Sequence, residues 1–284
     1  MCCRACRSCS RRARRTACSS CRSKFGRLPG VNVATVACLS DNYAYLIWQQ
    51  DSPDALVVDP SEHLPVLAAL KDRRLNLMGI LCTHHHWDHI GGVEELCRAQ
   101  PGLAVYCSDY DVPRIKGATR GLRHAESFDC IGLHFDCMRV PGHTLGALAY
   151  CAEDAVFTGD TLFGAGCGRL FEGTPAQMHA SLTSLASLAD DSKVYFGHEY
   201  TRANLAFAQT IETNNPTLRA RQQRILAASG GRSTPSSIKE ERDTNPFLRC
   251  AEPSVRRAMG PQFAESADYE VFAELRRRKD GFRA

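Results

Sequence analysis

The sequence predicts a layered α/β fold followed by a smaller, mainly helical region. Short strand-like runs alternate with helical segments from residue 31 to residue 200, and polar motifs recur where these runs end. Beyond residue 200 the spacing of apolar residues becomes helical. At 284 residues, the chain is long enough for one large domain with a smaller one beside it.

The predicted elements of residues 31–200 are short and are separated by turn residues. Apolar residues at helical spacing predict a helix over Ser61–Arg73, with Leu64, Val66, Leu67 and Leu70 on one face. The other predicted helices of this part are Gly92–Ala99 and Thr174–Ala189. The predicted strands, in chain order, are Val31–Cys38, Tyr43–Trp48, Ala55–Val58, Met78–Cys82, Leu103–Cys107, Ile131–Val140, Ala147–Cys151, Ala155–Thr158 and Val194–Phe196.

Residues 201–284 differ from this pattern and are predicted to form a separate domain packed on the first. Helical spacing covers Leu205–Glu212, Thr217–Ala228 and Ala264–Lys279. The Gly-, Ser- and Pro-rich segment Ser229–Ser237 is interpreted as a link between two of these helices.

The first 30 residues differ in composition from everything that follows. They hold nine Lys or Arg residues, six of the fifteen cysteines and no Asp or Glu. An Arg- and Ser-rich segment without acidic residues is typical of an organelle transit peptide, so we expect residues 1–30 to be disordered and removed on import. A mitochondrion is the expected destination, with a plastid or the cytoplasm as alternatives, and the scattered later cysteines are expected to be reduced. A zinc knuckle built on Cys2, Cys3, Cys6, Cys18 and Cys21 is disfavoured, because apolar residues that would pack around it are missing.

The charge balance and the hydropathy pattern disfavour two classes of partner, nucleic acid and the lipid bilayer. Without the nine N-terminal cations, the chain has 26 Lys and Arg residues against 31 Asp and Glu residues. This acidic balance disfavours nucleic acid, and no apolar run is long enough to predict a membrane span. We expect a soluble monomer, although its oligomeric state is not fixed by the sequence.

The strongest motif is His84-His85-His86-Trp87-Asp88-His89, which directly follows a predicted buried strand. In an extended segment, His84 and His86 project to the same side and can bind one metal ion. Asp88 and His89 follow the start of a turn and can face a second ion. Imidazole and carboxylate groups are typical ligands of zinc and other first-row divalent metals.

Three further candidate ligands each follow a glycine at the end of a predicted strand: His143, Asp160 and His198. Together with the first motif they complete two sets. His84, His86 and His143 are predicted to hold one ion, and Asp88, His89 and His198 the other. Asp160 is predicted to bridge the two ions, and Asp59 to hydrogen-bond a ligand histidine or, alternatively, to cap the helix near Ser61. The remaining histidines, His63, His85, His124, His134 and His179, are interpreted as structural or surface residues.

The pattern His84-x-His86-x-Asp88-His89 with separate His143, Asp160 and His198 resembles the metallo-β-lactamase-fold hydrolases. Longer strings narrow the resemblance to glyoxalase II, the hydroxyacylglutathione hydrolases, over residues 31–284. These strings are Gly159-Asp160-Thr161-Leu162-Phe163, Gly166-Cys167-Gly168-Arg169, Phe171-Glu172-Gly173-Thr174, Gly197-His198-Glu199-Tyr200-Thr201, Asn245-Pro246-Phe247 and Arg276-Arg277-Arg278-Lys279-Asp280. The resemblance implies a four-layer αββα catalytic domain over residues 31–200 and a helical substrate-binding domain over residues 201–284.

The resemblance also implies hydrolysis of S-D-lactoylglutathione to glutathione and D-lactate, the second step of methylglyoxal detoxification. Two divalent ions would activate a shared water as hydroxide, which attacks the thioester carbonyl. Zinc is the expected metal, with iron and manganese as alternatives. Asp88 is expected to orient the hydroxide as well as to bind metal.

Glutathione carries two carboxylates, so its site requires cations and hydrogen-bond donors. By resemblance, Arg169 and Tyr200 bind the tripeptide from the first domain, and Arg276 and Lys279 bind its glycine carboxylate from the second. Some family members carry lysine and tyrosine where this chain has Arg169 and Phe171; Phe171 cannot donate a hydroxyl hydrogen bond.

Four rival readings remain to be separated by metal analysis and a thioester assay. A persulfide dioxygenase of this fold would use a single iron, whereas this chain offers seven ligands. A β-lactamase would not use the helical region, and a nuclease would need a basic surface. A binding module without turnover would need only a closed four-ligand site.

Overall fold

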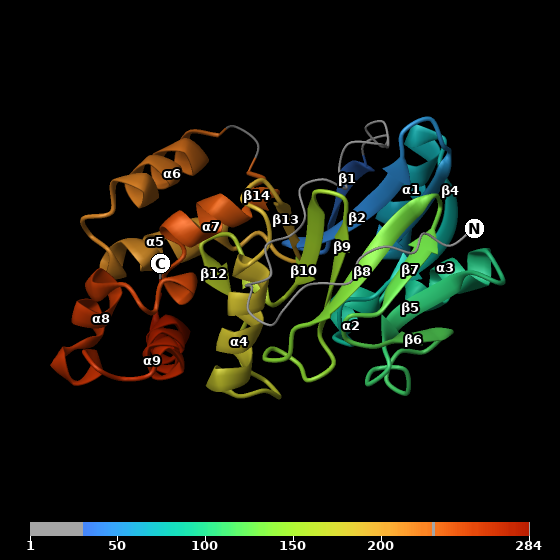
Figure 1. The fold of residues 1–284 in the computed structure, drawn as a ribbon. Coiled ribbons are helices and arrows are strands. Elements are labelled where there is room, and N and C mark those ends of the chain that lie inside the picture. Colours follow the sequence, from blue (N-terminus) through green and yellow to red (C-terminus); the bar gives the residue numbers. More distant parts are fainter. Residues whose placement is uncertain (1–30, 229–230, 284) are drawn as a thin grey trace, which may run out of the picture.

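The computed structural model describes residues 31–228 and 231–283, so the expected transit peptide lies outside the described residues. Two six-stranded sheets face each other, with strand orders β1-β2-β3-β4-β5-β6 and β14-β13-β10-β9-β8-β7 (Figure 1). The strands of the first sheet are β1 Val31–Cys38, β2 Asn42–Gln49, β3 Asp54–Val58, β4 Asn76–Leu81, β5 Ala104–Ser108 and β6 Arg120–Leu122. Those of the second are β7 Ser127–Cys130, β8 Leu133–Arg139, β9 Leu148–Ala152, β10 Ala155–Gly159, β13 Lys193–Phe196 and β14 Ser236–Ser237.

The first sheet is buried on both faces, because alternate residues of its strands pack into two different hydrophobic cores. Leu56 and Val58 of β3 belong to the core between the sheets, whereas Ala55 and Val57 belong to a second core shared with α1 and α3. These helices span His63–Arg73 and Val93–Ala99, and the four-residue α2 (Trp87–Ile90) lies between them.

The second sheet is covered by helix α4 (Pro175–Ala186). Phe157 of β10 faces the first sheet, since its ring lies 5.6 Å from that of Tyr45. Its neighbour Val156 must point the opposite way, and it is buried in the same cluster as Met178 and Leu182 of α4. The order of layers is therefore helix, sheet, sheet, helix, and the predicted αββα fold class is confirmed.

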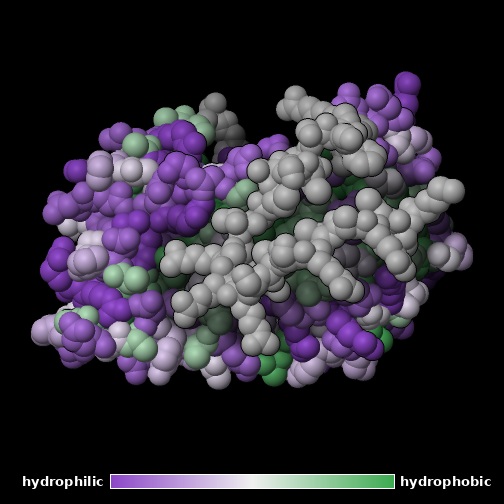
Figure 2. Space-filling model, viewed as in Figure 1, coloured by the Kyte–Doolittle hydropathy of each residue, from purple (hydrophilic) through white to green (hydrophobic). Residues whose placement is uncertain are grey.

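Residues 201–228 and 231–283 form the mainly helical part beyond α4 (Figure 1). Its helices are α5 Thr201–Ile211, α6 Pro216–Ala227, α7 Ile238–Thr244, α8 Pro253–Met259 and α9 Asp268–Gly281, with short 3₁₀ turns at Pro246–Leu248 and Pro261–Phe263. In the view of Figure 2 its surface is mostly hydrophilic, and hydrophobic residues appear singly. No helix among residues 31–228 and 231–283 is long and apolar enough to cross a bilayer.

Three sequence-based expectations need correction. Leu64 and Leu67 of α1 are exposed, at 67% and 38%, and only Val66 and Leu70 of the predicted apolar face are buried. The predicted strand at 131–140 starts later, because Ile131 and Gly132 have positive φ and form the turn before β8. The predicted link 229–237 ends in strand β14, which pairs antiparallel with β13.

Candidate dinuclear metal centre

Four chain segments meet where strands from both sheets end. The histidine motif follows β4, His143 follows β8, Asp160 follows β10 and His198 follows β13. Gly159, with φ of 48°, permits the sharp exit from β10, since a Cβ atom there would lie 2.3 Å from Thr83 Oγ1. A Cβ atom on Gly197 would lie 2.5 Å from Asp160 Oδ1. These two glycines allow the backbone to pass beside the crowded centre.

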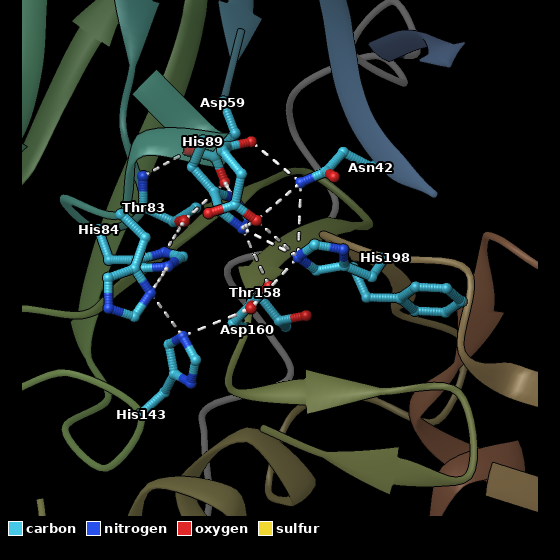
Figure 3. Close-up of polar contacts among 12 residues, drawn as sticks. Asn42, Asp59, Thr83, His84, His89, His143, Thr158, Asp160 and His198 are labelled. Atoms are coloured by element: carbon cyan, nitrogen blue, oxygen red, sulfur yellow. Dashed lines mark hydrogen bonds and ion pairs between the residues drawn. The ribbon is translucent and has the colours of Figure 1, made fainter. Parts of the chain in front are cut away.

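The structure brings all seven predicted ligands together in two groups. In the first group, His86 Nδ1 lies 3.1 Å from His84 Nε2 and 2.9 Å from His143 Nε2. In the second, His198 Nε2 lies 3.2 Å from His89 Nε2 and 3.4 Å from Asp88 Oδ2. Figure 3 shows the rings converging on one another.

Asp160 lies between the groups. Its Oδ2 is 3.4 Å from both His143 Nε2 and His198 Nε2, and its Oδ1 is 3.2 Å from His89 Nε2. The carboxylate thus lies beside ligands of both sets; that it bridges two ions stays a prediction.

These spacings fit metal ions. Ligand atoms held about 2.0–2.1 Å from one tetrahedral zinc ion lie about 3.3 Å apart. The donor set is three imidazoles in the first group, two imidazoles and a carboxylate in the second, and Asp160 shared between them. Asp160 Oδ1 is buried without a hydrogen-bond partner among the described residues. Divalent cations would satisfy these facing nitrogens and this oxygen.

The electrostatics of the two groups differ. Burial lowers the pKa of His86 to about 4 and also lowers those of His84 and His143, so these rings are neutral and able to bind metal. Although burial opposes its charge, Asp160 raises the pKa of His89 to about 10. The carboxylates around this group thus favour positive charge on the His89 ring, and a metal ion binding there would take the place of the proton.

Asp59 occupies the supporting position that was predicted for it. It follows β3, is almost fully buried, and its Oδ2 lies 2.9 Å from His89 Nδ1. The same carboxylate accepts hydrogen bonds from Thr83 N and Oγ1 at 2.7 and 2.6 Å. Asp59, His84 and His89 also lie close enough to form a third metal-binding set. The hydrogen bonds already made by Asp59 argue against that set.

Sequence reasoning missed two supports of the second group. Asn42 Nδ2 donates to the backbone oxygen and Oδ2 of Asp88, at 2.9 and 3.1 Å. Asp41 Oδ1 lies 2.8 Å from His198 Nδ1. Asp41 and Asn42 lie between the predicted strands Val31–Cys38 and Tyr43–Trp48, and neither was predicted to belong to the site; polar side chains at strand ends were the available signal.

A cavity of about 650 Å³ opens from the metal ligands toward α5 and α9. All five predicted substrate-binding residues line it: Arg169, Phe171, Tyr200, Arg276 and Lys279. Trp87, Phe163, Cys167, Ala203, Asn204 and Phe282, which the sequence did not single out, line it too. A second cavity of about 690 Å³ lies in the helical region beside Glu212 and Arg249, whose charges are already paired with each other.

The two predicted cations of the helical region, Arg276 and Lys279, differ in how many hydrogen bonds hold them. Arg276 is buried and donates to the backbone oxygen of Cys167 at 2.9 Å while pairing with Asp280. Among the described residues, Lys279 Nζ makes one long hydrogen bond, 3.4 Å to the backbone oxygen of Ala203, and lies over the rings of Phe207 and Phe282. Burial and the nearby Arg276 lower the pKa of Lys279 to about 8.

The aromatic residues flank the two metal groups. The Tyr200 ring stacks on His198 at 4.8 Å, and the Phe171 ring meets His86 and His143 edge-on at 5.5 and 5.2 Å. Phe171 is 64% exposed and lines the cavity.

Two family models match the chain: the metallo-beta-lactamase superfamily over residues 40–198 and the hydroxyacylglutathione hydrolase C-terminus over residues 199–282. The chain is 42% identical over 254 residues to a protein of Photobacterium profundum named hydroxyacylglutathione hydrolase, covering 89% of this chain and 100% of that protein. Among solved structures it is similar to ETHE1 from Myxococcus xanthus, with a TM-score of 0.61 and 26% identity over 87% of this chain and 90% of that one. It is also similar to TTHA1623 in a di-iron-bound form, with a TM-score of 0.56 and 26% identity over 76% of this chain and 100% of that one.

Proposed function

The chain belongs to the metallo-beta-lactamase superfamily and, within it, to the hydroxyacylglutathione hydrolases, and from this premise we propose that it hydrolyses S-D-lactoylglutathione to glutathione and D-lactate. The observation that carries the proposal is one cavity lined by the metal-ligand cluster and by Arg169, Arg276 and Lys279. A thioester of a dicarboxylic peptide requires both: a centre that activates water, and cations for its carboxylates.

The residues divide the work along this cavity. When bound, two divalent ions held by His84, His86, His143, Asp88, His89, His198 and Asp160 would supply hydroxide at neutral pH and polarise the thioester carbonyl. Asp88, fixed by Asn42, presents a partly exposed carboxylate that can orient the attacking oxygen. The leaving thiolate has an ordinary pKa of about 8.5, so no strong general acid is needed.

At the other end of the cavity, Lys279 has donors free for a substrate carboxylate. The guanidinium of Arg276 already contacts the backbone oxygen of Cys167 and the carboxylate of Asp280. We therefore propose that Arg276 uses its remaining donors to assist Lys279 in binding the same substrate carboxylate. Arg169, two-thirds exposed, and Tyr200 are proposed to contact the rest of the tripeptide. Phe171 supplies ring contact only, because it has no hydroxyl group.

The test uses the full chain with its metal content quantified. Loss of the thioester absorbance of S-D-lactoylglutathione measures turnover. The lactoyl thioester of N-acetylcysteamine, which has the same reacting bond and no carboxylate, should be a much poorer substrate. Equal turnover of the two thioesters would remove the glutathione assignment. Failure to hydrolyse either, with oxygen uptake on glutathione persulfide, would move the function to a dioxygenase.

We also propose zinc as the metal in both positions, on the grounds of ligand type, with iron or manganese as alternatives. TTHA1623 was solved in a di-iron-bound form, which supports iron as an alternative metal for this chain. Elemental analysis of the protein purified without added metal decides between them.

Residues 1–30 are proposed to direct the chain to mitochondria, with plastids and the cytoplasm as alternative outcomes. The proposal rests on composition alone. The bacterial relative above gives it no support. A fluorescent protein fused behind residues 1–30 tests it. A monomer that does not bind nucleic acid likewise remains a proposal, which light scattering and a gel-shift assay would check.

A further inference from the structure

One ligand of the first metal group lacks the support that its partners have. The outward nitrogens of His84 and His143 contact Thr83 Oγ1 at 3.0 Å and the backbone oxygen of Arg169 at 2.9 Å. His86 turns Nδ1 toward the group, and no residue within 31–228 or 231–283 hydrogen-bonds its Nε2. Ligand histidines usually have such an outer partner, which fixes the ring orientation. Something else must orient His86.

Two rings outside the ligand set contact His86. The His85 ring lies 5.1 Å away at 69°, and the Phe171 ring lies 5.5 Å away at 85°. Both are edge-on contacts, which are favourable between aromatic rings. Together with the other ligands they limit how far the His86 ring can turn.

A carboxylate contacts the His85 ring, and another belongs to the residue that follows Phe171. His85 Nδ1 lies 3.1 Å from Oδ1 of Asp111, whose exposed fraction is 0%. Phe171 is followed by Glu172, which accepts hydrogen bonds from Arg114 Nη1 at 2.7 Å and from the backbone N–H of Leu145 at 2.8 Å.

The network joins three loops around the first group. Asp111 and Arg114 lie in the turn after β5, and Arg114 Nη1 also lies 3.4 Å from His85 Nε2. The backbone N–H groups of Phe171 and Glu172 donate to the backbone oxygen of His143, at 3.2 and 3.3 Å. Asp111 is also pressed against the His143 loop, since a Cβ atom on Gly146 would lie 2.5 Å from its Oδ1.

We propose that Asp111, acting through His85, and the Arg114–Glu172 pair, acting through Phe171, are positioning residues that orient His86 and so set the metal affinity of the His84–His86–His143 position. The inference rests on the proposed metal centre. It goes beyond the ligands by predicting that the two metal positions have separate supports. The matching support of the other position is Asp41, which contacts His198.

The experiment measures zinc affinity by competition with a chromogenic chelator, using the full chain in two single-position backgrounds. His198→Ala weakens the second position, and His86→Ala weakens the first. Asp111→Ala should lower the affinity of the remaining zinc about tenfold in the His198→Ala background, as removal of an outer-shell partner does. In the His86→Ala background it should leave the remaining affinity within about twofold, because the groups that Asp111 contacts, His85 and the His143 loop, adjoin ligands of the first position only.

Asp41→Asn is the matched control and should show the opposite pattern. A general loss of stability or of negative charge would instead weaken both backgrounds equally, and that result overturns the proposal. So does an unchanged affinity in the His198→Ala background. Should Asp111→Ala fail to fold, His85→Ala, a partly exposed site in the same network, carries the same test. The readout is metal affinity without substrate, so its failure is distinguishable from failure of the proposed hydrolysis.

Discussion

The two ends of the cavity are built in opposite ways. At the metal end, the side chains are buried or half-buried at strand ends, and most have a second hydrogen-bonded partner behind them, such as Asp59 behind His89. At the cationic end, Arg169 is largely exposed and Lys279 makes one long hydrogen bond among the described residues, while Arg276 alone is buried and held by Cys167 and Asp280. Chemistry requires fixed geometry, whereas recognition of a flexible peptide requires donors that are still free. Substitutions at the metal end should therefore change kcat, and those at the cationic end KM.

The largest effect is expected for Asp160→Ala, which removes the side chain shared by both metal groups. Both ions should bind more weakly, and kcat should fall about a thousandfold, because several kcal/mol of transition-state stabilisation are lost. KM should change little. Thioester kinetics and elemental analysis measure both quantities. Asp154→Ala, an exposed site at the other end of β10, is the control. A large rise in KM would contradict the division between the two ends.

A smaller effect is expected for Asp59→Asn. The amide oxygen can still accept from Thr83 N, but the NH₂ group that replaces Oδ2 can accept neither from Thr83 Oγ1 nor from His89 Nδ1. Metal affinity should fall about 10- to 100-fold at the position that contains His89. Activity should be low at limiting zinc and recover with excess zinc, at unchanged KM. No recovery would indicate a folding defect, which circular dichroism would reveal.

At the cationic end, Lys279→Ala should raise KM about tenfold or more, since hydrogen bonds to charged groups contribute about 1.5–3 kcal/mol. The value of kcat should stay within about twofold. Arg277→Ala removes a cation from the same helix that does not line the cavity. It should leave both constants unchanged. If KM for Lys279→Ala equals that of the unaltered protein, Lys279 does not bind the carboxylate.

The smallest effect is a pH dependence that belongs to one end only. Burial favours the neutral amine of Lys279 and lowers its pKa to about 8. As pH rises through this value the free protein loses the charge that attracts the carboxylate, so kcat/KM should decline above about pH 8. Lys279→Arg, whose guanidinium stays charged, should remove the decline. A decline that persists in this variant would have to be assigned to another group.

The same contrast explains what the sequence could predict. His84, His86, Asp88 and His89 are adjacent in the chain, and the glycines before His143, Asp160 and His198 mark where strands end. Their gathering at one place could therefore be expected from local patterns. Strand and helix periodicity predicted a layered α/β fold, and the family resemblance implied its four αββα layers.

What could not be predicted depends on contacts between distant parts of the chain. Asp41 and His198 are 157 residues apart, and Asp111 and His85 are 26 apart. Such pairs leave no local pattern; strand alternation shows only that His85 points away from the His84 and His86 side, which predicts a structural or surface residue. Helices α7 and α8 have seven residues each, too few to show helical periodicity clearly.

Strand β14 has a consequence for how this chain can be divided. It consists of only Ser236 and Ser237, yet it covers the backbone of β13 at the margin of the second sheet. A fragment ending at residue 200 would leave β13 as an unprotected edge strand, with free N–H and C=O groups able to pair with another chain. Because β13 leads directly to His198, self-association of such a fragment would also disturb the metal centre. The helical part therefore covers the edge of the second sheet through β14, in addition to placing Arg276 and Lys279 beside the cavity.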